Sequence, residues 1–273
     1  MWRQILQRMG IVPHPKLVRR LKPDKPVHGL FCCPGRYGIE AGEVLCSVPC
    51  CLCVAPNISN HIHYGPALMR AVSSHSTTEG MVRVEYSRES ALTTVLCAIH
   101  MSHGPSDLRE YLEWIVVERP DDISMNHALG TELYGHLRTI ERINAEIITQ
   151  LCVDARSVGV PISIETMKRA HAICSSRCVD VPTHADIFGG PALVPFVDLI
   201  NHSSEDPNIT VAVESFPFLH CEQNQMLLEH FYVTVRAESG IHPEEELHYQ
   251  YLEPTDRQST NPLYWASRFH MFD

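Results

Sequence analysis

Apolar residues along this chain follow two different periods, and each period predicts a different kind of element. Between residues 27 and 54, short β-prone runs broken by Gly and Pro predict strands joined by tight turns, one of them at Ala41-Gly42-Glu43. The runs 209–213 and 231–235 alternate between apolar and polar residues, which is the period of half-buried strands. Residues 56–88 are polar and rich in His, Ser and Thr, so we expect a loop there.

The middle of the chain repeats apolar residues at the spacing of one helix face. Such stripes cover residues 91–99, 108–115, 129–151 and 164–174, and Ser163 can cap the last of them. Four helices in a row with strands on both sides indicate an insertion into a β-rich frame. Neither flank could close a sheet alone, so we do not expect the helices to form a separate domain.

The first 23 residues are basic and contain no acidic residue. Apolar side chains fall there at helical spacing, at Trp2, Ile5, Leu6 and Met9. This composition is typical of an organelle transit peptide, and also of a native first helix that ends at Gly10. We favour the native helix and a cytoplasmic or nuclear protein, with organelle import as the alternative.

Composition and charge exclude several classes of function. With 273 residues, 44% of them hydrophobic and 20% charged, the chain can bury a sizeable core. A net charge of −10 argues against nonspecific nucleic-acid binding by the whole surface. No run approaches the ~18 apolar residues of a membrane-spanning helix, so we expect no membrane insertion.

The 11 cysteines are scattered and follow no secretory signal, so we expect reduced thiols in an intracellular compartment. The tightest groups are Cys50-Cys51-x-Cys53, Cys174-x3-Cys178 and His61-x-His63. None has the paired C-x2-C spacing of a structural zinc site. We therefore expect no bound metal.

Two polar stretches carry the candidate chemistry. Residues 195–203 begin as an apolar run and end in Asp198-Leu199-Ile200-Asn201-His202-Ser203, which is typical of a buried segment that delivers polar groups to a pocket. A buried strand followed by an Asx turn is the alternative interpretation. The second stretch, Glu244 to Tyr251, adds acidic residues and two tyrosines.

With the second stretch included, the chain resembles a SET-domain methyltransferase. It most resembles the branch with a long helical insertion that contains the Rubisco large-subunit lysine methyltransferases and the actin-histidine methyltransferase. Four motifs occur in the family's order, over nearly the whole chain: Gly29-Leu30-Phe31 with the strands to Pro49, Cys174-Ser175-Ser176-Arg177, Asp198 to Ser203, and Glu245-Glu246-Leu247-His248-Tyr249-Gln250-Tyr251. Each motif is weak alone, and their order makes the resemblance specific.

The resemblance implies an α+β fold. We expect a β-rich SET domain of the β-clip type with a threaded C-terminal segment, a rare exception to the rule that chains do not thread loops. It would be a single domain over residues 1–273, with the helical insertion at about 90–178 and no C-terminal substrate-binding domain. We expect a monomer.

The resemblance also implies roles for individual residues. In the family, the Asn-His pair contacts S-adenosylmethionine, the Arg supports this cofactor and the final Tyr faces the methyl group. By the motifs, the cofactor would contact Gly29, Leu30, Arg177, Asn201 and His202, the catalytic residue would be Tyr251, and Val179 and Tyr249 would line the substrate channel. Asp198 would hold the threaded loop.

The implied reaction is methyl transfer to a lysine of a non-histone protein or peptide. An in-line displacement from a sulfonium needs positioning, water exclusion and a neutral amine, and a narrow apolar channel favours all three. The alternatives are a SET-fold peptide-binding module without turnover and a protein-histidine methyltransferase.

The chain departs from the family pattern in two places near the site. Val27-His28-Gly29-Leu30 lacks the first Gly of the usual Gly-x-Gly-Leu, which puts close backbone approach to the cofactor in doubt. Val179 stands where the family often has an aromatic residue or an Asn. We expect Val179 to widen the channel and to favour lysine over histidine as the acceptor.

Overall fold

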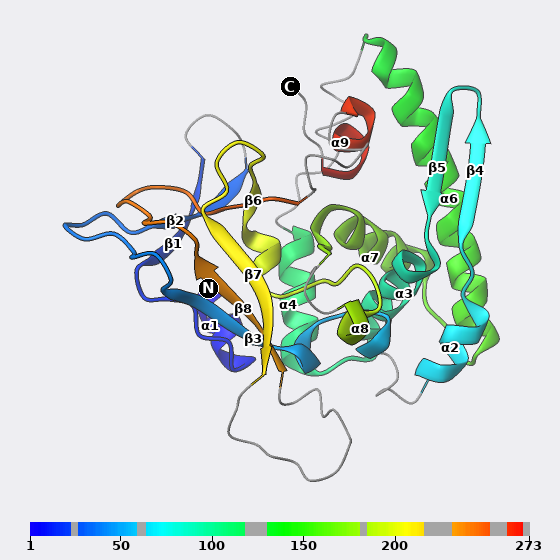
Figure 1. Cartoon of the computed structure of the whole chain (residues 1–273). Coiled ribbons are helices and arrows are strands. Elements are labelled where there is room, and N and C mark those ends of the chain that lie inside the picture. The colour runs from blue at the N-terminus through cyan, green and yellow to red at the C-terminus, as the bar shows by residue number, and fades with distance from the viewer. Residues whose placement is uncertain are drawn as a thin grey trace. The chain divides into compact units, whose positions relative to one another are not determined.

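The chain forms two compact units (Figure 1), and the computed structural model describes residues 1–22, 27–58, 64–117, 130–180, 185–215, 231–251 and 261–269. The first unit, unit 1, combines Met1–Cys53, Val179–Ala185 and Val194–Pro254. The second, unit 2, combines Val54–Cys178, Asp186–Leu193 and Thr255–Asp273. Each unit is therefore assembled from segments that are far apart in the sequence.

Unit 1 holds most of the strands. A three-stranded antiparallel sheet has the order β3-β8-β7, from Val44–Pro49, Phe231–Ala237 and Ile209–Ser215. A second antiparallel pair joins β1, Leu17–Leu21, to β2, His28–Cys32. The short strands β6, Asn201–His202, and β9, His248–Tyr249, pair in parallel.

The alternation of apolar and polar residues in the sequence matches the alternation of burial in β7, whereas in β8 Thr234 is buried as well as its apolar neighbours. In β7 the buried positions are Ile209, Val211 and Val213, and in β8 Val233 and Val235 face the same core. Val211 lies opposite Val235 and Val213 opposite Val233, so the two apolar faces coincide across the pair. The two predicted strands are confirmed.

The chain begins with α1, Trp2–Arg8, whose Ile5 and Leu6 are buried. The guanidinium of Arg3 donates to the carbonyls of Pro13 at 3.2 Å and His14 at 2.9 Å. This basic residue therefore ties the helix to the following segment. The predicted first helix is confirmed.

Residues 244–249 lie between two neighbours in unit 1. On one side, Glu244 N–H donates to the Cys32 carbonyl at 3.0 Å and Leu247 N–H to the Leu30 carbonyl at 2.8 Å. On the other side, the Asn208 side chain accepts from His248 N–H at 2.8 Å and donates to the Glu246 carbonyl at 2.8 Å. The closing motif is thus held between β2 and the loop that follows β6.

Unit 2 holds the helices expected from the periodic stripes. They are α3, Arg88–His103, α4, Ser106–Val117, α6, Glu132–Ser157, and α7, Ile164–Arg177. The Ser163 side chain accepts from Thr166 N–H, so the predicted cap is present. The remaining helices are α2, Gly65–Ala71, and α9, Pro262–Phe269, while the short α8, Ala185–Phe188, begins at the last residue of a unit 1 segment. None of the helices in the described ranges is long and apolar enough to cross a bilayer.

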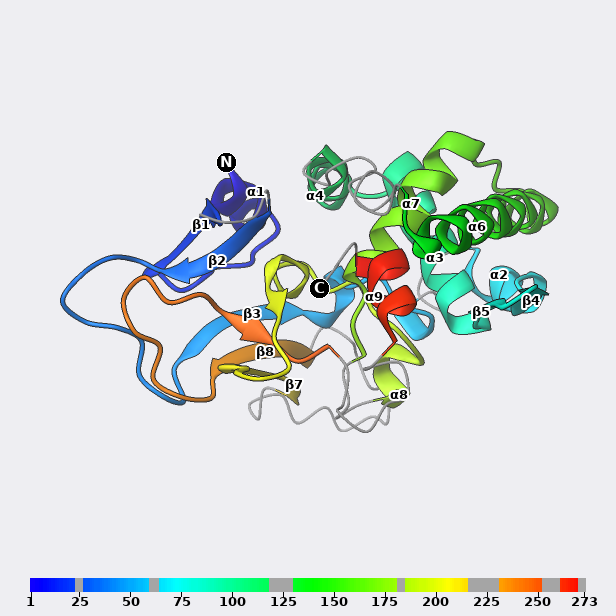
Figure 2. The same cartoon turned by 90° about the horizontal axis from the view of Figure 1, so that it is seen from above.

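The prediction of a loop at residues 56–88 is wrong. This segment contains α2 and an antiparallel hairpin of β4, His75–Glu79, and β5, Val82–Tyr86, which runs along α6 in Figures 1 and 2. In β5, Val82 is buried and Arg83 and Glu85 are exposed. β4 contains no apolar residue, and β5 alternates Val82, Val84 and Tyr86 with two charged residues over only five positions, so the hairpin gives a weak local signal. Its contact with α6 is not visible in the local sequence.

Candidate functional site

The amide of Asn201 lies against the backbone of β2. Its Nδ2 donates to the His28 carbonyl at 3.1 Å and to Glu246 Oε1 at 2.7 Å. A side-chain amide carries two N–H donors, so both are used. Among the described residues nothing donates to Oδ1 of Asn201, and this oxygen is what the side chain can offer a ligand.

Gly29 has no room for a side chain. A Cβ at this position would lie 2.3 Å from Glu246 Oε1 and 3.1 Å from Asn201 Nδ2. The backbone of β2 therefore approaches this pair of side chains as closely as only a glycine allows. Leu30, the next residue, is fully buried, and its carbonyl accepts from Leu247 N–H.

Glu246 is a buried carboxylate with three polar partners. Besides Asn201, its Oε2 lies 2.8 Å from Lys22 Nζ and 3.3 Å from His248 Nε2. Burial of the carboxyl opposes ionisation, but the hydrogen bonds from His248, Lys22 and Asn201 outweigh it and lower the pKa of Glu246 from 4.5 to about 2. Glu246 is therefore a carboxylate at neutral pH.

His202 and Tyr251 contact one another directly. His202 Nδ1 accepts from Tyr251 N–H at 3.0 Å, and the two ring centroids are 5.1 Å apart. Burial lowers the pKa of His202 below its usual 6.5, and the nearby His248 adds to this, while a bond with the Tyr249 backbone opposes it. An unprotonated Nδ1 that accepts from a backbone N–H is consistent with a neutral imidazole.

The hydroxyl of Tyr251 points toward the residue that precedes β6. It donates to the Ile200 carbonyl at 2.6 Å. Because the hydroxyl proton is used in this bond, the Tyr251 oxygen can only accept a hydrogen bond from any further group. Tyr249 lies beside it, with ring centroids 6.2 Å apart.

The structure thus brings together Asn201, His202, Tyr249 and Tyr251 at the pairing of β6 with β9, and Asn201 in turn reaches Gly29. Val179 is buried and also belongs to unit 1. Arg177 is the last residue of α7 and belongs to unit 2, and its role at the cofactor stays a prediction.

Asp198, expected to hold a threaded loop, is buried in the short 3-10 helix Val197–Leu199. Its backbone N–H donates to the Val194 carbonyl at 3.2 Å. Threading itself stays a prediction.

Sequence reasoning missed the partners of Asn201. The closing motif contains Glu246 but implies no role for it, and in the sequence Lys22 is only one of several basic residues near the start of the chain. Charges of opposite sign at distant positions are common, so nothing local could have paired these two. The pairing depends on β2 lying beside residues 244–247.

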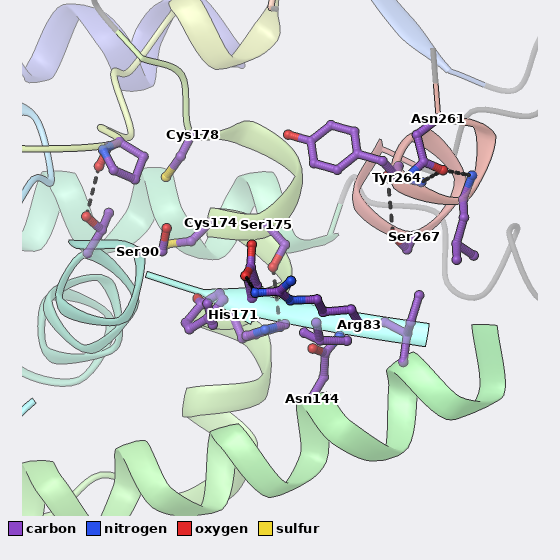
Figure 3. A pocket seen from close by; sticks show the side chains of 17 residues that line it. Arg83, Ser90, Asn144, His171, Cys174, Ser175, Cys178, Asn261, Tyr264 and Ser267 are labelled. Atoms are coloured by element: carbon purple, nitrogen blue, oxygen red, sulfur yellow. Dashed lines mark hydrogen bonds and ion pairs between the residues drawn. The ribbon is translucent and has the colours of Figure 1, made fainter. Parts of the chain in front are cut away.

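A cavity of about 270 Å³ lies wholly within unit 2 (Figure 3). Figure 3 shows His171 and Ser175 of α7 on one side of it and Tyr264 of α9 on another, and its two charged residues, Arg83 and Glu85, form an ion pair. None of the predicted site residues lines this cavity.

Cys50, Cys53, Cys174 and Cys178 of the two cysteine clusters are buried, and Cys51 is exposed. Burial raises the pKa of Cys50 to about 12 and that of Cys53 well above its usual value, so both are protonated and poor metal ligands. Within the described ranges, no three His, Cys, Asp or Glu side chains are placed to hold a metal ion. The pair His61 and His63 lies outside those ranges.

Three solved structures share the fold. The SET domain of LSMT bound to lysine and AdoHcy is 13% identical with a TM-score of 0.64, over 100% of this chain and 56% of that one. Rubisco LSMT bound to AdoMet is 13% identical with a TM-score of 0.60, over 100% and 55%. Rubisco LSMT bound to sinefungin and monomethyllysine is 14% identical with a TM-score of 0.57, over 99% and 55%.

The chain spans little more than half the length of these structures. No protein-family model matches the sequence, and no curated protein matches it. The structural likeness establishes the fold: the predicted α+β SET fold and the resemblance to the Rubisco methyltransferase branch are confirmed.

Proposed function

We propose that this chain, which has the SET-domain fold, is an S-adenosylmethionine-dependent methyltransferase whose acceptor is a lysine side chain of a protein or peptide. The observation that carries the proposal is the meeting of Asn201, His202 and Tyr251 at the β6–β9 pairing. The solved relatives bound to AdoMet, AdoHcy and lysine support the cofactor and the acceptor.

The residues of unit 1 suit this cofactor. Since both N–H donors of Asn201 are engaged, its Oδ1 remains as an acceptor, which suits the ammonium group of the cofactor's amino-acid part. Gly29 leaves the room that Glu246 occupies when it accepts from Asn201. The bound cofactor would supply the electrophilic methyl group on its sulfonium.

Tyr251 is the residue we assign to catalysis. Its hydroxyl donates to the Ile200 carbonyl and can therefore only accept from an incoming amine. Accepting one amine N–H fixes the direction of the nitrogen lone pair, which an in-line displacement requires. The bond to Ile200 and the His202 contact hold the ring, so little reorganisation is needed when the substrate arrives.

The amine must be neutral to attack. A free lysine has a pKa of about 10.4, so only about one in a thousand is neutral near neutral pH. A largely apolar channel would lower this pKa by desolvation. We assign Val179 and Tyr249 to that channel, and Val179 is among the buried residues of unit 1.

The residue at position 179 favours lysine over histidine as the acceptor. A valine at position 179 has no group to hydrogen-bond an imidazole. Mass spectrometry of a methylated native substrate tests this, and a modified histidine would contradict it. A monomer acting on a protein in the cytoplasm or nucleus, with Arg177 supporting the cofactor, completes the proposal.

Calorimetry with purified protein tests the cofactor. We expect AdoHcy to bind, and Asn201→Ala to weaken binding ten- to a hundredfold, because a lost polar contact in a buried site costs about 1–3 kcal/mol. Asn144→Ala, on helix α6 of unit 2, is the matched control and should bind as the parent does. Equal affinity in parent and Asn201→Ala would remove the cofactor from this segment.

Labelled AdoMet with a cell lysate tests turnover. Transfer of the label to a protein supports the enzyme. Cofactor binding without transfer, over lysates from several sources, would favour the peptide-binding module instead.

A further inference from the structure

We infer that Glu246 is a positioning residue, which fixes the orientation of the Asn201 amide so that its oxygen faces the ligand. The inference rests on the proposed function for the identity of that ligand. Its structural part rests on the contacts of the two side chains alone.

The orientation of an asparagine amide is decided by its partners. The oxygen and nitrogen ends have nearly the same shape, so an isolated Asn201 could turn either end toward β2. Both partners of Asn201 are pure acceptors, namely the His28 carbonyl and the Glu246 carboxylate. Only the NH2 end satisfies them, and a flip would place the amide oxygen against two other oxygens.

The Glu246 carboxylate is itself held in place. Its side chain is 9% exposed, and Oε2 is bonded to Lys22 and His248, which leaves Oε1 for Asn201. Oε1 occupies the space that a side chain at position 29 would fill. Glu246, with Lys22, His248 and the glycine around it, therefore leaves the Asn201 amide one arrangement.

Of the two oxygen partners, Glu246 has the larger effect. Its bond to Asn201 is the shorter, at 2.7 Å against 3.1 Å for the His28 carbonyl, and its acceptor carries a full charge. Hydrogen bonds to charged groups are roughly twice as strong as those between neutral groups. Removing the charge should therefore release the amide even though the His28 carbonyl remains.

The test compares Glu246→Gln with the parent against two ligands. Glutamine keeps the volume but can donate as well as accept, so it no longer selects one end of Asn201. We expect AdoHcy to bind about tenfold more weakly, because its ammonium then meets either amide end. Binding of 5′-methylthioadenosine, which lacks the amino-acid part, should stay within about twofold.

A second variant and a control separate positioning from general support. Glu246→Ala should weaken AdoHcy binding further, with the same selectivity between the two ligands. Glu244→Gln, an exposed carboxylate of the same segment that pairs with Arg20 and not with Asn201, should leave both affinities unchanged. Equal losses for both ligands in Glu246→Gln, or no loss for either, would overturn the inference.

A readout without cofactor keeps the inference apart from the proposed function. In the parent, both Asn201 side-chain amide protons are hydrogen-bonded, so their NMR signals should exchange slowly with solvent. In Glu246→Gln the exchange should speed up, while backbone amides of β2 keep their protection. If the parent binds no AdoHcy, the proposed function fails, and the exchange measurement alone then tests the positioning role of Glu246. Unchanged exchange of the Asn201 amide protons in Glu246→Gln would contradict that role.

Discussion

Gly29→Ala adds a single methyl group where the candidate site has no room for it. The added Cβ would lie 2.3 Å from Glu246 Oε1, 3.0 Å from Glu246 Cδ and 3.1 Å from Asn201 Nδ2. The first distance is about 1 Å inside ordinary carbon–oxygen contact. The Glu246 side chain must therefore move, and it can do so only by stretching its bonds to Lys22, His248 or Asn201.

The cost follows from these contacts. Overpacking by one methylene group costs about 1–3 kcal/mol, and a weakened hydrogen bond to a charged group costs about 1.5–3 kcal/mol. These two costs do not add in full, because the movement of Glu246 that weakens its hydrogen bonds also relieves the overpacking. The lower entropy of the unfolded alanine chain offsets about 0.4–1 kcal/mol. We expect a net loss of about 1–3 kcal/mol in the free energy of unfolding.

Urea unfolding followed by circular dichroism measures this loss, and calorimetry measures the AdoHcy affinity of the same protein. The affinity should fall about tenfold or more, because Asn201 is displaced with Glu246. Gly35→Ala is the matched control, since a Cβ there meets nothing within 4 Å. It should leave stability and affinity unchanged within error.

The result that refutes this reasoning is a Gly29→Ala protein as stable as the Gly35→Ala control with the parent's affinity. Glu246 would then be free to move without loss. A loss of stability with unchanged affinity would separate the packing at Gly29 from the cofactor.

Two further predictions concern the tyrosine and the buried carboxylate. Tyr251→Phe should keep the fold and cofactor binding but lower the rate of methyl transfer at least ~10²-fold, because one well-placed polar group in a dry site is worth about 2.7–4 kcal/mol in the transition state. Single-turnover assays measure this rate. Full activity would show that Tyr251 is not the catalytic residue, and Tyr249→Phe would be the next variant to test. The pKa of Glu246 is lowered from 4.5 to about 2, so the folded protein binds fewer protons than the unfolded chain in that window, and the carboxylate's stabilisation is complete above pH 4.5 and lost as the pH falls toward 2. The stability difference between the parent and Glu246→Gln in urea should shrink across this window; a constant difference would show that the ionised carboxylate adds nothing.

The sequence alone determined the elements whose own residues carry the period. The apolar stripes placed α3, α4, α6 and α7, and the alternation at 209–213 and 231–235 placed β7 and β8. Each of these elements buries apolar side chains of its own, on one face in α7 and β7 and all round in α3, so the signal lies in its own residues. The order of the motifs likewise predicted that Asn201, His202 and Tyr251 belong to one site, and these residues lie together because β6 pairs with β9.

Tertiary structure decided what depends on contacts between distant segments. The β4–β5 hairpin gives little local signal, because β4 has no apolar residue and both strands have five residues, whereas its packing against α6 joins segments far apart in the sequence. The importance of Gly29 was read as a matter of cofactor approach, whereas the structure shows that Glu246 and Asn201 already fill the space beside it. Lys22 and Glu246 come from opposite ends of the chain, and their pairing exists only once β2 and residues 244–247 lie side by side. A charge or a glycine carries no record of its partner in the local sequence, because one residue of that type is compatible with many neighbours.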